Sequence, residues 1–315
     1  MYLVSIVCLV YNQEKYIEQA LSSFIEQKTN FDFEIVVFDD ASTDATMTIV
    51  NKYKETYPNR IRIIAQKKNQ YSQHGLTHNY KLAIDTCTSK YIAYCEGDDY
   101  YIDPYKLQKQ VDFMEANPDY NLVHTGYKRY KDYKKRFSKF DCTTRTIPTG
   151  DVLHELILFN HIIAPTTLFK TEIAKEALSK LTPISKKENW KTTDYPLWMY
   201  LAMHGKFGYI KDITTVYRLT KSSLSNRKNK KVYVDFLCSI HDIKLFFINY
   251  ANINKQKAEY VIADSIAAIF RLSVKFNSPK KKYYRTLYLQ NRHINKNWKL
   301  DFYAKYPIFD WIYRR

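Results

Sequence analysis

The stretch YIAYCEGDDYY, residues 91–101, begins like a buried strand and ends in acidic residues. Its first five residues carry the aromatic and β-branched side chains that are typical of a strand in a core. Three carboxylates follow at once: Glu96, Asp98 and Asp99. Gly97 lets the backbone turn there and lets a ligand come close. A core strand that leads into this much negative charge indicates either a solvated loop or a ligand site.

The segments around this stretch alternate between strand-like and helix-like patterns. Buried apolar strands are expected at residues 3–10, 33–38, 61–65 and 91–95. Apolar residues recur at helical spacing in four further segments, residues 14–27, 45–53, 75–86 and 107–114. This alternation predicts a Rossmann-like α/β fold, in which a mostly parallel sheet has helices on both faces. Ligands bind such sheets at the carboxyl ends of the strands, which is where the three carboxylates lie.

After about residue 120 the chain changes to mixed strands and helices, with strands expected at residues 121–130 and 161–170. Residues 226–315 look largely helical, with apolar faces that suit packing on another surface. This region is also basic, because residues 228–315 hold eighteen Lys and Arg against six Asp and Glu in a chain of net charge +17. Two interpretations stay open: a solvated surface with a Lys bias, and a contact with an anionic membrane or another polyanion.

The cysteines and the first apolar run bear on where the protein works. The five cysteines are scattered and contain no C-x-x-C pair, which favours buried thiols in a reducing compartment over disulfides or zinc ligands. The apolar run at residues 3–11 is too short to span a membrane and follows no basic residue, so a signal peptide is not expected. We expect a cytoplasmic protein whose basic tail is able to touch the inner face of the membrane.

A second pair of carboxylates, Asp39 and Asp40, ends the strand at residues 33–38. Residues 42–44 are expected to cap the next helix, but a cap needs only one oxygen, so the pair remains available to accept a hydrogen bond from a nucleotide base. The three carboxylates at residues 96–99 repel one another when partly buried. A hard divalent cation, Mg²⁺ or Mn²⁺, compensates such charge and is commonly shared with substrate phosphates.

Four stretches together carry a resemblance: SIVCLVYNQEKYIEQALSSFIEQ, FEIVVFDDASTDAT, YIAYCEGDDYYIDPYKLQKQVDF and TDYPLWMYLAMHGKFGYI. In this order and spacing they are similar to a family 2 glycosyltransferase of the GT-A fold, of the type that builds bacterial polysaccharides. The resemblance covers about residues 1–225. It implies a nucleotide-binding half at about residues 1–118 and an acceptor half at about residues 119–225. Residues 226–315 form the helical, basic region outside it.

The resemblance also implies which residues bind the nucleotide. The backbone of Leu9, Val10 and Tyr11 would line the base and the ribose. The base itself would be bound by Asp39 and Asp40.

The family's D-x-D motif falls on residues 96–99, where Glu96 and Gly97 would lie at the nucleotide. The implied metal ligands are Asp98, Asp99 and Glu96, with Glu96 in place of the motif's first Asp. The family's Ala-Arg-Asn appears here as Thr-His-Asn at residues 77–79, so the segment that begins at Asn69 is expected to cover the donor instead.

The implied catalytic base is Asp194, in the stretch TDYPLW where the family has Glu-Asp-aromatic at a helix start. The alternative role for Asp194 is a helix N-cap, because Pro196 is typical of a first helical turn. Arg218 ends the strand that follows this helix and resembles a family position near the donor, but a lone Arg is more often structural.

Taken together, the sequence predicts a metal-dependent, inverting glycosyltransferase. The expected partners are a nucleotide-diphosphate sugar, with UDP as the expected nucleotide, and a saccharide or lipid-linked acceptor. A nucleic-acid partner is not expected. The chain has no G-x-S-x-G, G-x-x-x-x-G-K-[ST] or G-x-G-x-x-G motif, which removes three rival chemistries. The alternative is a catalytically inactive protein of the same fold that binds polyanions through its basic tail.

Overall fold

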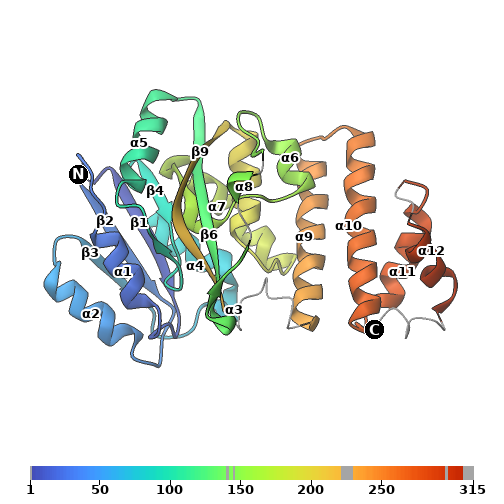
Figure 1. Ribbon diagram of the computed structural model, residues 1–315, viewed down its shortest axis with the longest axis horizontal. Coiled ribbons are helices and arrows are strands. Elements are labelled where there is room, and N and C mark those ends of the chain that lie inside the picture. The colour runs from blue at the N-terminus through green and yellow to red at the C-terminus, as the bar shows by residue number, and fades with distance from the viewer. Residues whose placement is uncertain (1, 140–141, 145, 221–229, 295–296, 308–315) are drawn as a thin grey trace. The chain divides into compact units, whose positions relative to one another are not determined.

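The computed structural model describes residues 2–139, 142–144, 146–220, 230–294 and 297–307. The chain divides into two units. One consists of the residues up to Asn189 with Thr193–Thr220, and the other of Trp190–Thr192 with the residues after Thr220. Figure 1 labels the elements of both units along the chain.

The first half of the larger unit is built from four parallel strands and the helices between them (Figure 1). The strands are β1 (Val4–Val10), β2 (Phe33–Asp39), β3 (Ile61–Ala65) and β4 (Tyr91–Tyr94). The helices are α1 (Ile17–Ile25), α2 (Thr46–Thr56), α4 (Leu76–Asp85) and α5 (Lys106–Ala116). These elements confirm the four strands and four helices predicted from the apolar pattern, although α1 is shorter than expected at both ends. The short helix α3 (Tyr71–His74) was not predicted.

The second half extends the same sheet with strands of both directions. Its strands are β5 (Tyr100–Tyr101), β6 (Tyr120–Lys131), β7 (Arg136–Phe137), β8 (Thr167–Lys170) and β9 (Lys206–Leu219). Its helices are α6 (Leu153–Leu158), α7 (Thr171–Lys187) and α8 (Asp194–Met203). Three 3-10 turns complete this half: η1 (Asp132–Lys134), η2 (Cys142–Thr144) and η3 (Ala164–Thr166).

The strand predicted at residues 161–170 is wrong in its first part. Only β8, its last four residues, pairs in the sheet, and the 3-10 turn Ala164–Thr166 precedes it. Pro165 lies inside that turn and has no N–H to give to a ladder, which explains why the strand begins only at Thr167. The strand predicted at residues 121–130 is confirmed as β6.

The order of the strands decides which ends meet at the site. Along the sheet they run β3-β2-β1-β4-β8-β6-β9-β5, with β7 on β6. β8 is antiparallel to both β4 and β6, whereas β6 and β9 are parallel to each other. Two reversals restore the original direction, so the carboxyl ends of β6 and β9 lie at the same edge as those of β1, β2 and β4.

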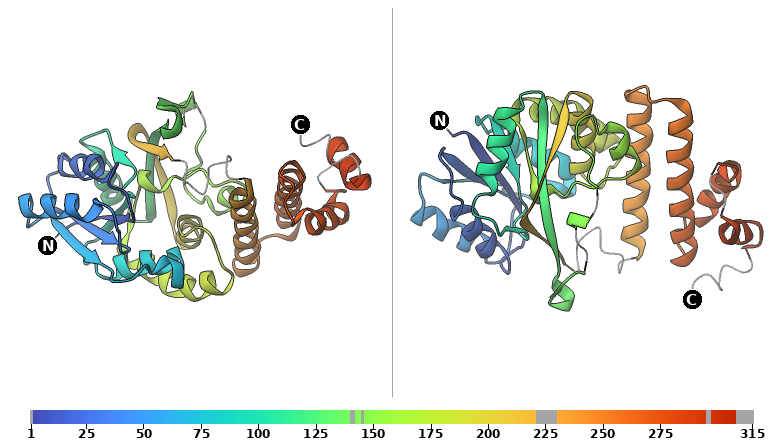
Figure 2. Two further views of the ribbon diagram at one scale, coloured as in Figure 1. Left: turned by 90° about the horizontal axis from the view of Figure 1, so that it is seen from below. Right: turned by 45° about the horizontal axis from the view of Figure 1, so that its top comes forward.

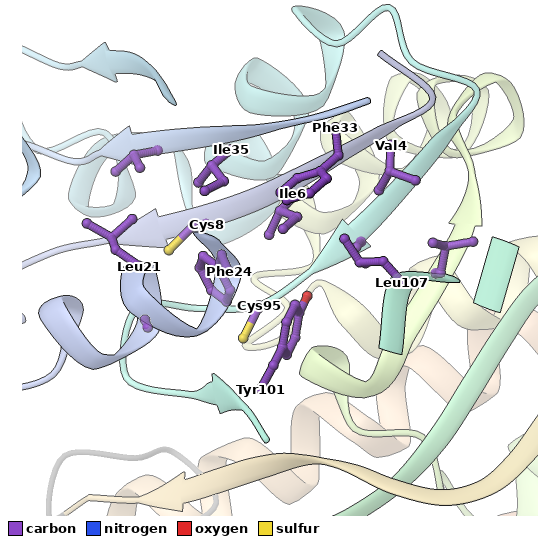
Figure 3. Packing of buried hydrophobic residues seen from close by; sticks show 14 of the residues in the cluster. Val4, Ile6, Cys8, Leu21, Phe24, Phe33, Ile35, Cys95, Tyr101 and Leu107 are labelled. Atoms are coloured by element: carbon purple, nitrogen blue, oxygen red, sulfur yellow. The ribbon is translucent and has the colours of Figure 1, made fainter. Parts of the chain in front are cut away.

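The core lies between the sheet and the helices on its faces. Residues of β1 and β2 that point to one face of the sheet pack against α1, α2 and α5. Figure 3 shows Ile6 and Cys8 of β1 beside Phe24 of α1. Tyr101 from β5 closes the same cluster against Phe24, with ring centroids 5.0 Å apart. Helices α4, α7 and α8 lie on the other face (Figures 1 and 2). All five cysteines are buried and unpaired, as predicted.

The second unit is helical, as predicted for the C-terminal region. It contains α9 (Lys230–Tyr250), α10 (Lys255–Lys275), α11 (Lys281–Asn291) and α12 (Trp298–Lys305). Its core joins Phe270 and Val274 of α10 to Tyr284 and Tyr288 of α11. None of the helices in the described ranges is both long and apolar enough to cross a bilayer.

Candidate active site

The loops after β1 and β2 are tied together by side chains that satisfy backbone groups. Ser42 Oγ accepts a hydrogen bond from the Asn12 N–H at 2.9 Å, and Asn12 Oδ1 accepts one from the Thr43 N–H at 2.8 Å. The N-cap of α2 is Ala45, which makes no side-chain cap, and Asp44 one residue earlier accepts the N–H of Thr46 through its Oδ1 at 2.9 Å. The two strand ends therefore form one continuous rim.

Asp39 and Asp40 are both buried at the end of β2, and they have different partners. The oxygens of Asp39 accept the N–H of Ser42 in the turn that follows, at 3.2 Å. Asp40 instead accepts two backbone N–H groups from the start of α3, those of Gln70 at 2.6 Å and Tyr71 at 3.0 Å. Asp40 thereby fixes the segment after Asn69 beside the end of β2.

The backbone that was expected to line the base lies on the same rim. Leu9 and Val10 are buried, while Tyr11 is half exposed. The carbonyl of Val10 accepts the Asp40 N–H at 3.1 Å, and the carbonyl of Leu9 accepts the Gly97 N–H at 3.2 Å. The loops that leave β1, β2 and β4 are therefore joined by main-chain hydrogen bonds.

Gly97 lies in a tightly packed position, and it does not have the special backbone conformation that the expected turn would use. Its φ is not positive; among the described glycines only Gly75 and Gly150 have that conformation. A Cβ on Gly97 would instead lie 2.2 Å from Gln13 Oε1 and 2.7 Å from Val10 Cγ1. The position is limited to glycine by the close approach of the loop after β1, and not by a special turn.

The acidic residues after β4 differ in exposure, and each of their carboxyls has a raised pKa. Glu96 and Asp98 are half-buried, and Asp99 is 1% exposed. Burial raises the pKa of the Glu96 carboxyl to about 7, and the charge of Asp98 adds to that rise. Burial also raises the pKa of Asp98, to about 6, and that of Asp99 well above its usual value. The protein alone does not supply enough positive charge for these carboxylates.

Arg218 is the positive charge that the fold does supply to the acidic loop. Its backbone N–H donates to Asp99 Oδ1 at 2.6 Å, and its guanidinium donates to the carbonyl of Asp98 and to Gln19 Oε1. The guanidinium also lies over the rings of Tyr16 and Tyr100, 4.7 and 5.1 Å from their centroids. Arg218 is 6% exposed and lowers the pKa of Asp98 against the effect of burial.

Tyr80 is a second contact of this loop, and no motif in the sequence pointed to it. It lies on α4 and donates a hydrogen bond to the Glu96 carboxylate. Its ring packs on Tyr94 with centroids 4.4 Å apart, and Tyr94 in turn meets Trp198 of α8 at 6.2 Å. These aromatic side chains join the acidic loop to α4 and α8.

Asp194 is the first residue of α8 and is not its N-cap, which is Thr193. Asp194 Oδ1 accepts the N–H of Tyr195 at 2.7 Å. The hydroxyl of Thr193 lies 3.1 Å from that of Thr77 on α4, which fixes the start of α8 beside the start of α4. Asp194 lies near enough to raise the pKa of Glu96, so the structure brings the expected base and the acidic loop together.

The arrangement limits how a metal ion could be held. Within the part of the chain that the structure describes, no three His, Cys, Asp or Glu side chains converge as a metal-binding group. Glu96 accepts from Tyr80, and one oxygen of Asp99 accepts from Arg218. The carboxylates fit a Mg²⁺-like ion that takes one or two protein ligands and completes its shell with substrate phosphates.

Comparison with known proteins places this geometry in a family. A family model described as Glycosyl transferase family 2 matches residues 5–177, which include the ends of β1, β2 and β4. The chain belongs to glycosyltransferase family 2.

Among curated relatives, an uncharacterised protein of Mycobacterium tuberculosis is 43% identical over 116 residues, which cover 37% of this chain and 32% of that protein. The chain therefore matches about a third of the length of this relative. The Escherichia coli UDP-Glc:α-D-GlcNAc-diphosphoundecaprenol β-1,3-glucosyltransferase WfaP is 30% identical over 233 residues, 74% of this chain and 83% of that enzyme.

The fold of this family 2 member is that of solved GT-A glycosyltransferases. The structure of Staphylococcus aureus TarS residues 1–349 in complex with UDP-GlcNAc aligns with a TM-score of 0.55 at 16% identity. The alignment covers 94% of this chain and 91% of the TarS chain. The mostly parallel sheet predicted from the apolar pattern is confirmed by this likeness and by the strand order.

Proposed function

We propose that this chain is an inverting, metal-dependent glycosyltransferase that uses a UDP-sugar and works in cell-surface polysaccharide or glycolipid synthesis. The observation that carries the proposal is the run of Glu96, Asp98 and Asp99 after β4, whose carboxyls all have a raised pKa, with the charge of Asp194 near enough to add to the rise at Glu96. The donor class is supported by the relative WfaP, whose name gives UDP-Glc as donor and a lipid diphosphate as acceptor. The acceptor of this chain is accordingly a saccharide or lipid-linked hydroxyl.

On the donor side, the proposal assigns the rim of β1 and β2 to the nucleoside. Asp39 accepts from the uracil N–H, and the backbone of Leu9, Val10 and Tyr11 lines the base and the ribose. Asp40 would act indirectly. Its carboxylate holds the backbone of the segment that follows Asn69, and this segment would lie over the donor.

At the diphosphate, the acidic loop carries the charge balance. Asp98 and Asp99 would hold Mg²⁺ or Mn²⁺ together with phosphate oxygens, and Glu96 and Gly97 would lie beside the ribose and diphosphate. Such an ion supplies neutralisation of the leaving diphosphate. The raised pKa values of the three carboxyls support this assignment, because they mark an anionic site with too little positive charge of its own.

On the acceptor side, Asp194 would take the proton of the attacking hydroxyl. The oxygen forms its bond to the anomeric carbon as the bond from that carbon to the diphosphate breaks, so the products are the glycoside, UDP and a protonated Asp194. The attack comes from the face opposite the leaving group and inverts the anomeric centre. Asp194 lies in the first turn of α8.

Titration calorimetry with UDP tests the donor side. Wild type should bind UDP with Mn²⁺ and lose binding in EDTA, and Asp98→Asn should bind much more weakly. Asp194→Asn should keep UDP binding while turnover falls by roughly 10²–10⁴-fold. Asp112→Asn is a matched control, because Asp112 is an exposed carboxylate on α5 that accepts a hydrogen bond from Gln108 on the same helix. Failure of wild type to bind UDP with metal present would remove the donor assignment.

A further inference from the structure

The last helix of the described chain carries a row of exposed aromatic rings. Trp298, Phe302 and Tyr306 follow one another at four-residue spacing on α12 and its C-terminal residue, and their exposed fractions are 76, 41 and 51%. Trp298 is the most exposed of the large hydrophobic side chains described. Four residues correspond to about 6 Å along a helix, so the rings follow one another along one side of α12 in a row inclined to its axis.

The helix is oriented by its other face, so the rings point outward for a structural reason. Leu300 and Ala304 are buried in the core of the helical unit. The side chain of Asn297 caps the helix by accepting the Leu300 N–H at 3.1 Å, and Asp301 accepts from the Tyr288 hydroxyl of α11 at 2.9 Å. α12 therefore cannot turn its ring-bearing face inward without losing these contacts. Figure 1 shows α12 lying against α11.

The helix that carries the ring row, and the unit it belongs to, are basic. Lys299 and Lys305 are exposed on α12 itself, and the Lys299 ammonium lies 5.4 Å from the centre of the Trp298 ring. Residues 271–315 contain twelve Lys and Arg against two Asp. Further exposed lysines of this unit are Lys275, Lys280 and Lys282.

We propose that this aromatic and basic face, defined by Trp298, Lys299, Phe302, Lys305 and Tyr306, docks on an anionic membrane surface. A helix that offers Trp and Phe with Lys on one face, and lies flat, has the composition of an interfacial membrane helix. Aromatic rings prefer the headgroup region, and lysines are attracted to anionic headgroups. A second copy of the chain is disfavoured as the occupant, because two such basic faces would repel each other. This inference does not rest on the proposed transferase reaction.

Co-flotation with lipid vesicles tests the docking face. Full-length wild type should float with vesicles of phosphatidylglycerol and phosphatidylcholine, and much less with phosphatidylcholine alone. The triple variant Trp298→Ala/Phe302→Ala/Tyr306→Ala should lose this binding. Lys299→Gln and Lys305→Gln should each weaken it by about fivefold, and less at high salt.

Two controls separate docking from a folding defect. Tyr260→Ala removes a 51% exposed ring from α10, and Tyr105→Ala removes a 48% exposed ring from the larger unit; both should float like wild type. The triple variant removes exposed side chains only, so its circular dichroism and melting curve should match those of wild type.

A spectroscopic readout locates the contact. Trp190 and Trp198 are buried, so the emission difference between wild type and Trp298→Phe reports an exposed tryptophan. That difference spectrum should shift to the blue when anionic vesicles are added. The proposal is overturned if wild type does not float, if the triple variant floats unchanged, or if no shift occurs. It is equally overturned if the ring row mediates self-association or binding to a polynucleotide in place of vesicle binding.

Discussion

Replacement of Arg218 by Met should lower the free energy of unfolding strongly. Apart from changes to the acidic residues, we expect it to be the most destabilising single substitution at this edge of the sheet. The guanidinium donates to the Asp98 carbonyl and the Gln19 side chain, and it is almost fully enclosed. Hydrogen bonds to charged groups contribute about 1.5–3 kcal/mol each, and each cation–π contact about 0.5–2 kcal/mol. The apolar Met side chain recovers part of that loss through burial. We expect a net fall of about 3–5 kcal/mol in the free energy of unfolding once this recovery is subtracted from the lost hydrogen bonds and cation–π contacts.

The pH dependence gives this prediction a second signature. Asp98 already has a folded-state pKa of about 6, above its ordinary 3.8, because burial outweighs the attraction of Arg218. A carboxyl with a raised folded-state pKa destabilises the fold as pH rises through that pKa, since its charged form is the disfavoured one. Without Arg218 the pKa should rise further. The loss of stability in Arg218→Met should therefore be larger at pH 8 than at pH 4.

Urea unfolding followed by circular dichroism at both pH values measures these effects. Arg60→Met is the matched control: Arg60 also stacks on a ring, that of Phe33 at 4.8 Å, but it is exposed, and the change should cost less than about 1 kcal/mol. Arg218→Lys keeps the positive charge but loses the planar guanidinium and its several N–H donors. Its stability should lie between those of wild type and Arg218→Met. A loss below about 1 kcal/mol in Arg218→Met, or one that does not grow with pH, would refute the role given to this residue.

Three further changes test other parts of the fold. Lys106 is fully buried, and burial lowers its pKa to about 7. Between pH 7 and 10.5 the unfolded state therefore binds more protons than the folded state, so the stability of wild type should rise with pH across that range. This rise should be absent in Lys106→Met. His124 has a pKa lowered to about 3 by burial, so stability should fall as pH drops below 6.5, and His124→Phe should remove that dependence in acid unfolding curves. Gly97→Ala should cost about 1–3 kcal/mol through the clash with Gln13 and Val10, and the added change Gln13→Ala should recover part of it in the same urea assay.

The sequence was most informative where the chemistry is local. Apolar runs of the length of a strand, separated by segments of helical periodicity, are written into consecutive residues, so β1 to β4 and their helices could be predicted. The same holds for the position of the acidic residues, because a parallel strand carries its next residues to the carboxyl edge of the sheet. Glu96, Asp98 and Asp99 were found in this way, at the end of the strand in which the stretch YIAYCEGDDYY begins.

What the sequence alone left undecided depends on contacts between distant residues. Arg218 reaches Asp99 across 119 positions because β8 lies antiparallel between β4 and β6, so that β9 runs in the direction of β4, and because β5 pairs with β9. Tyr80 meets Glu96 because α4 packs on the face of the sheet beside β4, and the need for glycine at position 97 comes from a side chain of the loop after β1. Periodicity along the chain records burial, but it does not record which buried side chains become neighbours. The partners that balance the charge of the acidic loop were therefore decided by the tertiary structure.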